Sequence, residues 1–168
     1  MFVIKKSKGF TLIELLVVIA VIGLLAVIFL VALNSAKAKA RNAKRNADIR
    51  QLATAFEISN IAKNEPFPDC DLACISTSCS SWGTEIGANP VLDEYLKPYI
   101  AFHPTDPADP KREIQGYLYH HDDNSNKSFL YWALETALFS AMNSCGPGTL
   151  ADPFPAENYI LCQYTLNI

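Results

Sequence analysis

The first candidate functional residue is Glu14, a carboxylate inside an apolar run. Residues 15–33 carry no charge, and only Gly23 interrupts their bulk. A lone carboxylate in the apolar core of a membrane costs several kcal/mol, and the sequence suggests no partner for Glu14 in its own helix. Such a residue is a functional candidate by default, unless it snorkels to the lipid headgroups from its place near the helix end.

The second group of candidates is the cysteines: Cys70, Cys74, Cys79, Cys145 and Cys162. The first three are spaced C-x3-C-x4-C, which is not zinc-ribbon spacing. A Cys3His site with His103, reduced thiols packed as small apolar groups, and disulfides in an exported domain are the alternatives. Because a C-x3-C pair has poor disulfide geometry in a helix and a wider loop relaxes that demand, we predict Cys70–Cys79 with Cys74 free.

The third group is the polar stretch His120, His121, Asp122, Asp123 and Asn124. These side chains include metal-ligand types, but Asp and Asn in a turn more often serve the turn geometry. We therefore predict no metal site here. No nucleophile-base set, phosphate-binding loop or HExxH motif occurs, so we expect no enzyme.

The apolar run has the length of a membrane span. Nineteen uncharged residues at about 1.5 Å each make a helix of about 28 Å, close to the thickness of the hydrocarbon core. A secretory signal peptide with a cleavage site at residues 36–38 fits less well, because apolar cores of signal peptides have about 7–15 residues. A plain membrane anchor fits the length.

The helix is expected to continue beyond the span. Residues 34–64 contain no Pro or Gly, and Ile49, Leu52 and Phe56 recur at helical spacing, which predicts an amphipathic segment with a packed domain. Pro66 and Pro68 then end a single helix that begins near Thr11.

The remainder predicts a small α+β domain. We expect an irregular loop over residues 69–89, a short helix over residues 90–100, and strands over residues 116–120, 129–134 and 159–164. A turn at residues 121–126 makes the first two strands a hairpin. The predicted fold class is therefore α+β, with a long N-terminal α-helix packed on a small antiparallel sheet.

Charge is divided unevenly along the chain. Residues 1–45 hold eight Lys or Arg against one Glu, whereas residues 46–168 hold six against sixteen Asp or Glu. An acidic domain has no electrostatic attraction for phosphate backbones, so we expect no direct nucleic-acid partner.

The N-terminal segment resembles a known family. Lys8-Gly9-Phe10-Thr11-Leu12-Ile13-Glu14, after Lys5 and Lys6, resembles the class III signal of type IV pilins and type II secretion pseudopilins. The resemblance implies cleavage between Gly9 and Phe10 by a prepilin peptidase, followed by N-methylation of Phe10. It also implies that Glu14 pairs with the Phe10 amine of a neighbouring subunit during assembly.

The resemblance divides the chain into a leader peptide (1–9), a transmembrane and polymerisation helix (10–33), its amphipathic continuation (34–64) and a globular head (65–168). It implies a structural subunit of a type IV pilus or type II secretion pseudopilus that polymerises through the helix. The implied partners are copies of itself or related pilins, the prepilin peptidase, the inner-membrane assembly platform and the lipid bilayer. The alternative is a single-pass, membrane-anchored extracellular binding domain that does not polymerise.

Two features of the sequence predict opposite orientations of the chain in the membrane. The leader offers three lysines, while the opposite flank offers more basic residues, so the positive-inside rule alone places the head in the cytoplasm. Those residues are Lys37, Lys39, Arg41, Lys44, Arg45 and Arg50. Prepilin-type processing implies an outward head, and five cysteines suit an oxidising compartment. We predict a single pass through the cytoplasmic membrane with the head outside, and then an extracellular or periplasmic filament.

Two further expectations come from the resemblance. Pilins commonly staple their C-terminal region with a disulfide, which implies a Cys145–Cys162 bridge that closes a loop worth about 3 kcal/mol. Major pseudopilins often carry a calcium loop near the position of Asp122, Asp123 and Asn124, although these three residues do not spell a defined calcium motif.

Overall fold

A computed structural model describes residues 9–76, 78–81, 84–107, 114–135, 145–151 and 159–166. The leader residues 1–8, including Lys5, Lys6 and Lys8, lie outside them. The chain divides into two compact units, Met1–Lys37 and Ala38–Ile168. The helix α1 (Leu12–Lys63) contributes to both units, and each unit is described by itself.

The boundaries of α1 follow from local chemistry. Thr11 precedes the first helical residue, and the helix ends where Asn64 adopts a left-handed φ of 53°, two residues before Pro66. Asn is one of the few residues that accept this conformation at a helix C-terminus. The predicted helix from Thr11 to Lys63 is therefore confirmed, and the left-handed Asn64 ends it just before the prolines.

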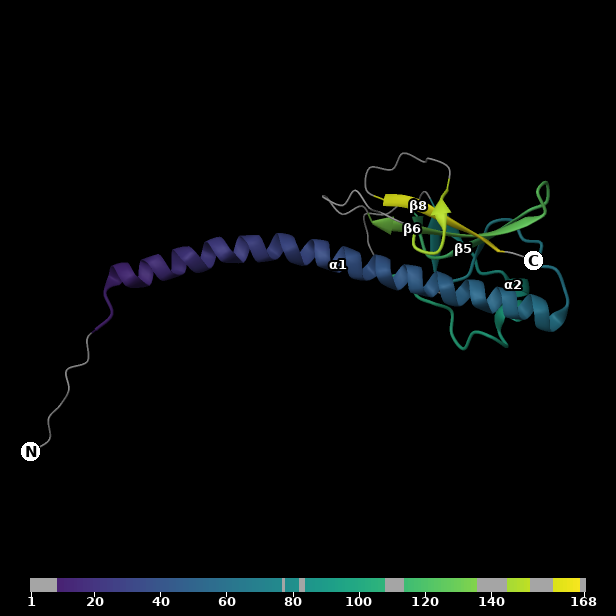
Figure 1. Cartoon of the computed structure of the whole chain (residues 1–168), viewed down its shortest axis with the longest axis horizontal. Coiled ribbons are helices and arrows are strands. Elements are labelled where there is room, and N and C mark those ends of the chain that lie inside the picture. Colours follow the sequence, from purple (N-terminus) through teal and green to yellow (C-terminus); the bar gives the residue numbers. More distant parts are fainter. Residues whose placement is uncertain are drawn as a thin grey trace, which may run out of the picture. The chain divides into compact units, whose positions relative to one another are not determined.

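The second unit contains two antiparallel sheets. The larger has the strand order β1-β5-β6-β8-β7, and the smaller has the order β3-β2-β4. Figure 1 shows β5, β6 and β8 side by side. The strands are β1 (Ala73–Cys74), β2 (Cys79–Ser81), β3 (Thr84–Ile86), β4 (Ile114–Gln115), β5 (Leu118–Asp122), β6 (Lys127–Glu135), β7 (Thr149–Leu150) and β8 (Tyr159–Leu166).

The core of this unit lies between α1 and the larger sheet. Ile49, Leu52 and Phe56 of α1 are at most 1% exposed and belong to one cluster with Tyr119 of β5 and Trp132 of β6. The ring of Phe56 stacks on Tyr119 with 5.1 Å between centroids. Each large apolar side chain buried in this way stabilises the fold by about 1.5–3 kcal/mol. The predicted α+β class is confirmed.

Three local predictions need correction. Residues 69–89 are not wholly irregular, because β1 and β2 form there through pairing with the distant strands β5 and β4, and β3 pairs locally with β2. The helix α2 (Pro90–Leu96) stops before residue 100, because Pro98 has no backbone N–H with which to continue the helical hydrogen bonds, although Lys97 before it still has helical dihedrals. The hairpin's first strand begins at Leu118 rather than Gly116, whose φ of +87° suits a turn.

Candidate functional site

The polar groups at the start of α1 form a reciprocal hydrogen-bonded pair. The Thr11 backbone N–H and hydroxyl donate to Glu14 Oε2 at 2.9 and 2.8 Å, and the Glu14 N–H donates to Thr11 Oγ1 at 3.3 Å. This is a capping box, which satisfies free N–H groups at a helix start. The expectation that Glu14 has no partner in its own helix was therefore wrong. The spacing Thr-x-x-Glu is the sequence signal that would have revealed Thr11.

The capping box leaves part of the Glu14 carboxylate available. Both hydrogen bonds that the carboxylate accepts from Thr11 end on Oε2, and within the described part of the chain Oε1 accepts none. Phe10 is 81% exposed, and a side chain added at Gly9 would meet nothing within 4 Å. Gly9 and Phe10 precede the helix, so the bond between them is open to a peptidase. The structure thus places Gly9, Phe10 and Glu14 within one exposed stretch.

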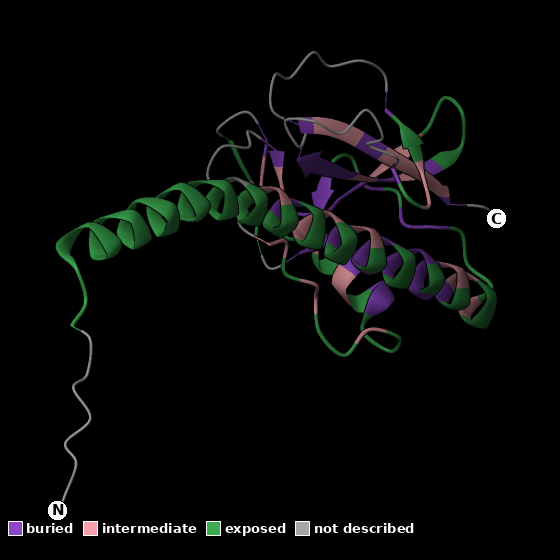
Figure 2. Ribbon diagram, turned by 60° about the vertical axis from the view of Figure 1, so that its left-hand side comes forward, coloured by how far each residue is buried: buried purple, intermediate pink, exposed green. Residues whose placement is uncertain are grey.

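The following part of α1 is an apolar surface. Figure 2 shows it exposed, and the large apolar side chains described between Leu12 and Leu33 are 47–81% exposed. Among the described residues, one helix is long and apolar enough to cross a membrane, with a mean hydropathy of 3.4 in its most apolar window. Exposure of so much apolar surface is unfavourable in water. The surface is consistent with membrane anchoring.

The second unit contains a buried ion cluster on α1. Arg45 is fully buried, and its guanidinium donates to Asp106 Oδ1 at 2.7 Å and to Glu135 Oε1 at 2.8 Å. Arg41 forms a two-pronged pair with the same Glu135. Burial raises the pKa of Glu135, but the hydrogen bonds and charges of the two arginines outweigh this effect and lower it to about 2. Glu135 therefore stays ionised inside the fold.

Two asparagines on the same side of α1 complete this contact. Asn42 bonds the backbone of Glu135 through both ends of its amide, at 2.9 and 3.0 Å, and Asn46 Oδ1 accepts from Trp132 Nε1 at 3.0 Å. This cluster was not predicted from the sequence. The signal was present, because Asn42 and Arg45 lie on the helical face that continues as Ile49 and Leu52.

The cysteines pair differently from the prediction in one case. Cys145–Cys162 is a disulfide, as the resemblance implied. The predicted Cys70–Cys79 bridge is wrong: Cys79 pairs with Cys74, and Cys70 is free and buried. The ends of β1 and β2 bring Cys74 and Cys79 to a Cα–Cα distance of 5.6 Å, which suits a disulfide.

This pairing also removes the proposed Cys3His site. Cys74 and Cys79 form the disulfide, so they are not available as metal ligands, and the third cysteine, Cys70, is buried. Burial, together with the charge of Asp69, raises the pKa of the Cys70 thiol. The side-chain amide of Asn89 donates to its sulfur at 3.1 Å.

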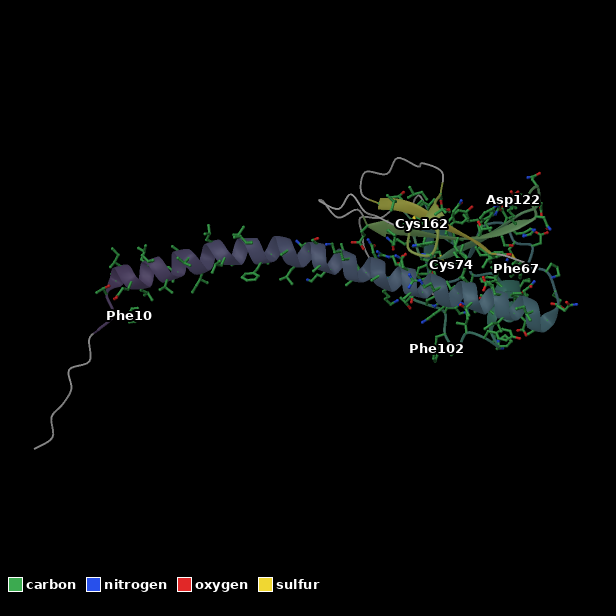
Figure 3. All side chains as sticks on the ribbon, in the orientation of Figure 1. Phe10, Phe67, Cys74, Phe102, Asp122 and Cys162 are labelled. Carbon is green, nitrogen blue, oxygen red and sulfur yellow. A yellow bond between two sulfur atoms is a disulfide. The ribbon has the colours of Figure 1, made fainter. Side chains whose placement is uncertain are left out.

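The candidate calcium turn is organised by its own hydrogen bonds. Asp122 accepts from the Asn124 N–H at 3.1 Å and from the Ser125 hydroxyl at 2.6 Å, which lowers the pKa of Asp122. Figure 3 labels Asp122 at the tip of the β5–β6 hairpin. Within the described ranges, no three His, Cys, Asp or Glu side chains are grouped so as to hold a metal ion.

Comparison with known protein families matches residues 4–30 to the prokaryotic N-terminal methylation motif. No curated protein and no solved structure matched the chain in the corresponding comparisons. The matched segment is the class III prepilin leader of type IV pilins and pseudopilins. Together with the long helix packed on antiparallel sheets, it supports a pilin-like protein of the prepilin-processed type.

Proposed function

We propose that this protein is a structural subunit of a type IV pilus or a type II secretion pseudopilus. A prepilin peptidase cleaves between Gly9 and Phe10, and the new N-terminus at Phe10 is methylated. The subunit then polymerises with copies of itself or with related pilins on an inner-membrane assembly platform. Its role is structural rather than catalytic.

One observation carries this proposal: the exposed apolar segment, residues 10–33, lies mostly within the matched motif at residues 4–30 and contains a single carboxylate, Glu14. Lipid covers such a segment before assembly, and the same segments of other subunits cover it in a filament. The free Glu14 Oε1 is available to the Phe10 amine of a neighbour. Pairing these groups removes an unpaired charge from each subunit and fixes the axial step between subunits.

The proposed orientation places the head outside the cytoplasmic membrane. The two disulfides support an oxidising compartment. The basic residues that argued for the cytoplasm are partly neutralised in the folded head, where Arg41 and Arg45 face Glu135 and Asp106, and Lys44 pairs with Asp48. The mature subunit then belongs to an extracellular or periplasmic filament.

The deciding experiment is mass spectrometry of the mature N-terminus. A chain that begins at methylated Phe10 is expected. An intact Met1, or a cut near Ala38, would instead support the membrane-anchored binding domain that does not polymerise. Neighbouring genes for a secretion outer-membrane channel or for a retraction ATPase would then distinguish pseudopilus from pilus.

A further inference from the structure

The loop that follows α2 presents an aromatic side chain to solvent. Phe102 is 87% exposed, and Figure 3 shows its side chain pointing away from α1. The loop is fixed close to Phe102 on its C-terminal side: His103 Nδ1 lies 2.8 Å from the Ile75 carbonyl oxygen, and Lys44 Nζ donates to the Thr105 carbonyl at 2.6 Å. Arg45 then binds Asp106. A fixed, exposed aromatic ring is typical of an interaction surface.

A groove of about 640 Å³ lies between this loop and α1. Its apolar lining includes Leu52, Ala55, Ile58, Tyr99, Ile100 and Phe102. Ile58 is 45% exposed, and the outward positions of α1 near the groove carry no acidic side chain. A helix face in water normally carries charges of both signs, so this face is suited to being covered.

Arg50 gives the groove a positive charge. It is exposed and lines the groove, and among the described residues its guanidinium has no hydrogen bond or ion pair. Asp48, the acidic residue of the lining, is already bound by Lys44 Nζ and the Tyr117 hydroxyl at 2.8 and 2.7 Å. The groove therefore has an available cation and no available carboxylate.

The same chain carries a complementary surface at the outer end of β1 and β5, which we call the acidic edge: Asp69, Asp71, Leu72 and Asp123. The side chains of Asp71 and Asp123 are 98% and 79% exposed, and Leu72 is 41% exposed. One oxygen of each carboxylate lies near a histidine, Asp71 Oδ1 at 3.4 Å from His120 Nδ1 and Asp123 Oδ1 at 3.8 Å from His121 Nε2, and the rest of each carboxylate faces solvent. None of these residues lines the groove. The acidic edge thus combines exposed carboxylates with an apolar side chain, as the groove combines a cation with apolar walls.

We propose that the groove binds the acidic edge of a second copy of this chain, with Leu72 against the apolar wall and Asp69 and Asp71 facing Arg50. Because the two surfaces differ, the contact is heterologous and continues from copy to copy, as a filament requires. This inference rests on the proposed function and adds a contact between heads to the one made by the N-terminal helices.

The test is photo-crosslinking in the full-length chain, in cells that make filaments, with a benzoyl-phenylalanine at position 102. The expected product has twice the mass of the chain, and glutamate-specific digestion links residues 95–113 of one copy to residues 58–85 of another. Mixing isotopically heavy and light chains confirms that the link joins two copies. Mass-spectrometric fragmentation should place it within residues 69–72.

Charge reversals sharpen the test. Arg50→Glu should reduce the crosslinked dimer at least fivefold, and the double variant Arg50→Glu/Asp71→Arg should restore most of it. The matched control is Lys127→Glu, which makes the same change of charge at an exposed position beside the acidic edge and should not reduce the dimer.

The outcomes separate this inference from the proposed function. The head contact would be overturned, and the proposed function retained, by one set of results. The chain would form filaments with methylated Phe10, but position 102 would crosslink only to lipid, only to other parts of the head, or to nothing. Equal yields from Arg50→Glu and the unaltered chain would also overturn it. A chain with an uncleaved leader and no filaments would overturn the function itself.

Discussion

Glu14 and Glu135, which lie in the two different units of the chain, differ in how their charges are neutralised. Glu14 stands in the apolar segment, where among the described residues its side chain is hydrogen-bonded to Thr11 of the same helix start. Glu135 stands in the second unit, 6% exposed, and is bound by Arg41 and Arg45 from the packed segment of α1, residues 38–63. The carboxylate of Glu135 has its partners within the chain, whereas the carboxylate of Glu14 can still accept a hydrogen bond or an ion pair from another subunit.

The apolar side chains of the two segments repeat this difference. In the packed segment, Ile49, Leu52 and Phe56 are buried against the sheet, whereas the large apolar residues of the apolar segment are all exposed where described. The buried face of the packed segment is thus complete within one copy of the chain. The apolar segment requires lipid or other subunits to cover it. Substitutions in the apolar segment are therefore best tested by filament assembly, and substitutions on the buried face of the packed segment by the free energy of unfolding.

The largest expected effect is at Glu14. Glu14→Ala should leave membrane insertion and leader cleavage intact but abolish filaments, counted by electron microscopy, because the Phe10 amine of the neighbour loses its counter-charge. Glu14→Gln is the matched control, since Gln can still form the capping box. Normal filaments from Glu14→Gln would show that only the cap matters, and normal filaments from Glu14→Ala would end the pairing hypothesis.

Processing should depend on Gly9 nearly as strongly. Gly9→Val should accumulate full-length precursor on immunoblots, because a side chain crowds the peptidase at the cleavage site. The chain itself has open space at Gly9 and equally at Gly23, so Gly23→Ala is a matched control that should be cleaved normally. Equal precursor levels in Gly9→Val and the unaltered chain would argue against a class III leader.

In the packed segment, the largest effect is expected from the buried cation. Arg45→Met should lower the free energy of unfolding by about 3–5 kcal/mol, because it leaves the buried carboxylates of Asp106 and Glu135 without their shared partner. Denaturation in detergent, followed by tryptophan fluorescence, measures the loss. The exposed Arg50→Met should change stability by less than about 0.5 kcal/mol. Similar losses from both variants would contradict the assigned role of Arg45.

The same cluster predicts acid sensitivity. The pKa of Glu135 is about 2 in the folded chain, against an ordinary value of 4.5. Its stabilising effect is therefore complete above about pH 4.5 and is lost as the pH falls toward 2, by at most about 3 kcal/mol. Unfolding measured between pH 5 and pH 2 should show a shallower decline in Glu135→Gln than in the unaltered chain.

The disulfides are expected to contribute amounts similar to or smaller than that of Glu135, and the shorter bridge contributes the least. Cys145→Ser should cost about 3 kcal/mol and Cys74→Ser about 2 kcal/mol, because the second bridge closes the shorter loop. Peptide mapping of exported protein without reduction should find Cys145 linked to Cys162 and Cys74 linked to Cys79. Only Cys70 should react with an alkylating reagent after unfolding. A fully alkylated Cys162 would refute the C-terminal bridge.

Several features were predictable because they depend on neighbours in the sequence. The uninterrupted apolar run predicts the first part of α1, and the helical spacing of Ile49, Leu52 and Phe56 predicts its packed face. Alternating aromatic residues around a polar turn predict the β5–β6 hairpin. Leader motifs are likewise short and contiguous, so Gly9, Phe10 and Glu14 could be identified from the sequence.

Other features were decided only by the tertiary structure. The strands β1, β2 and β3 lack apolar alternation: β1 and β2 pair with the distant strands β5 and β4, and β3 pairs with β2. The ends of β1 and β2 then place Cys74, rather than Cys70, beside Cys79. Arg45 and Glu135 are 90 positions apart, and no local pattern predicts their contact. Periodicity reports which face of an element is buried, but the choice of partner depends on how the elements pack, and that information is not local.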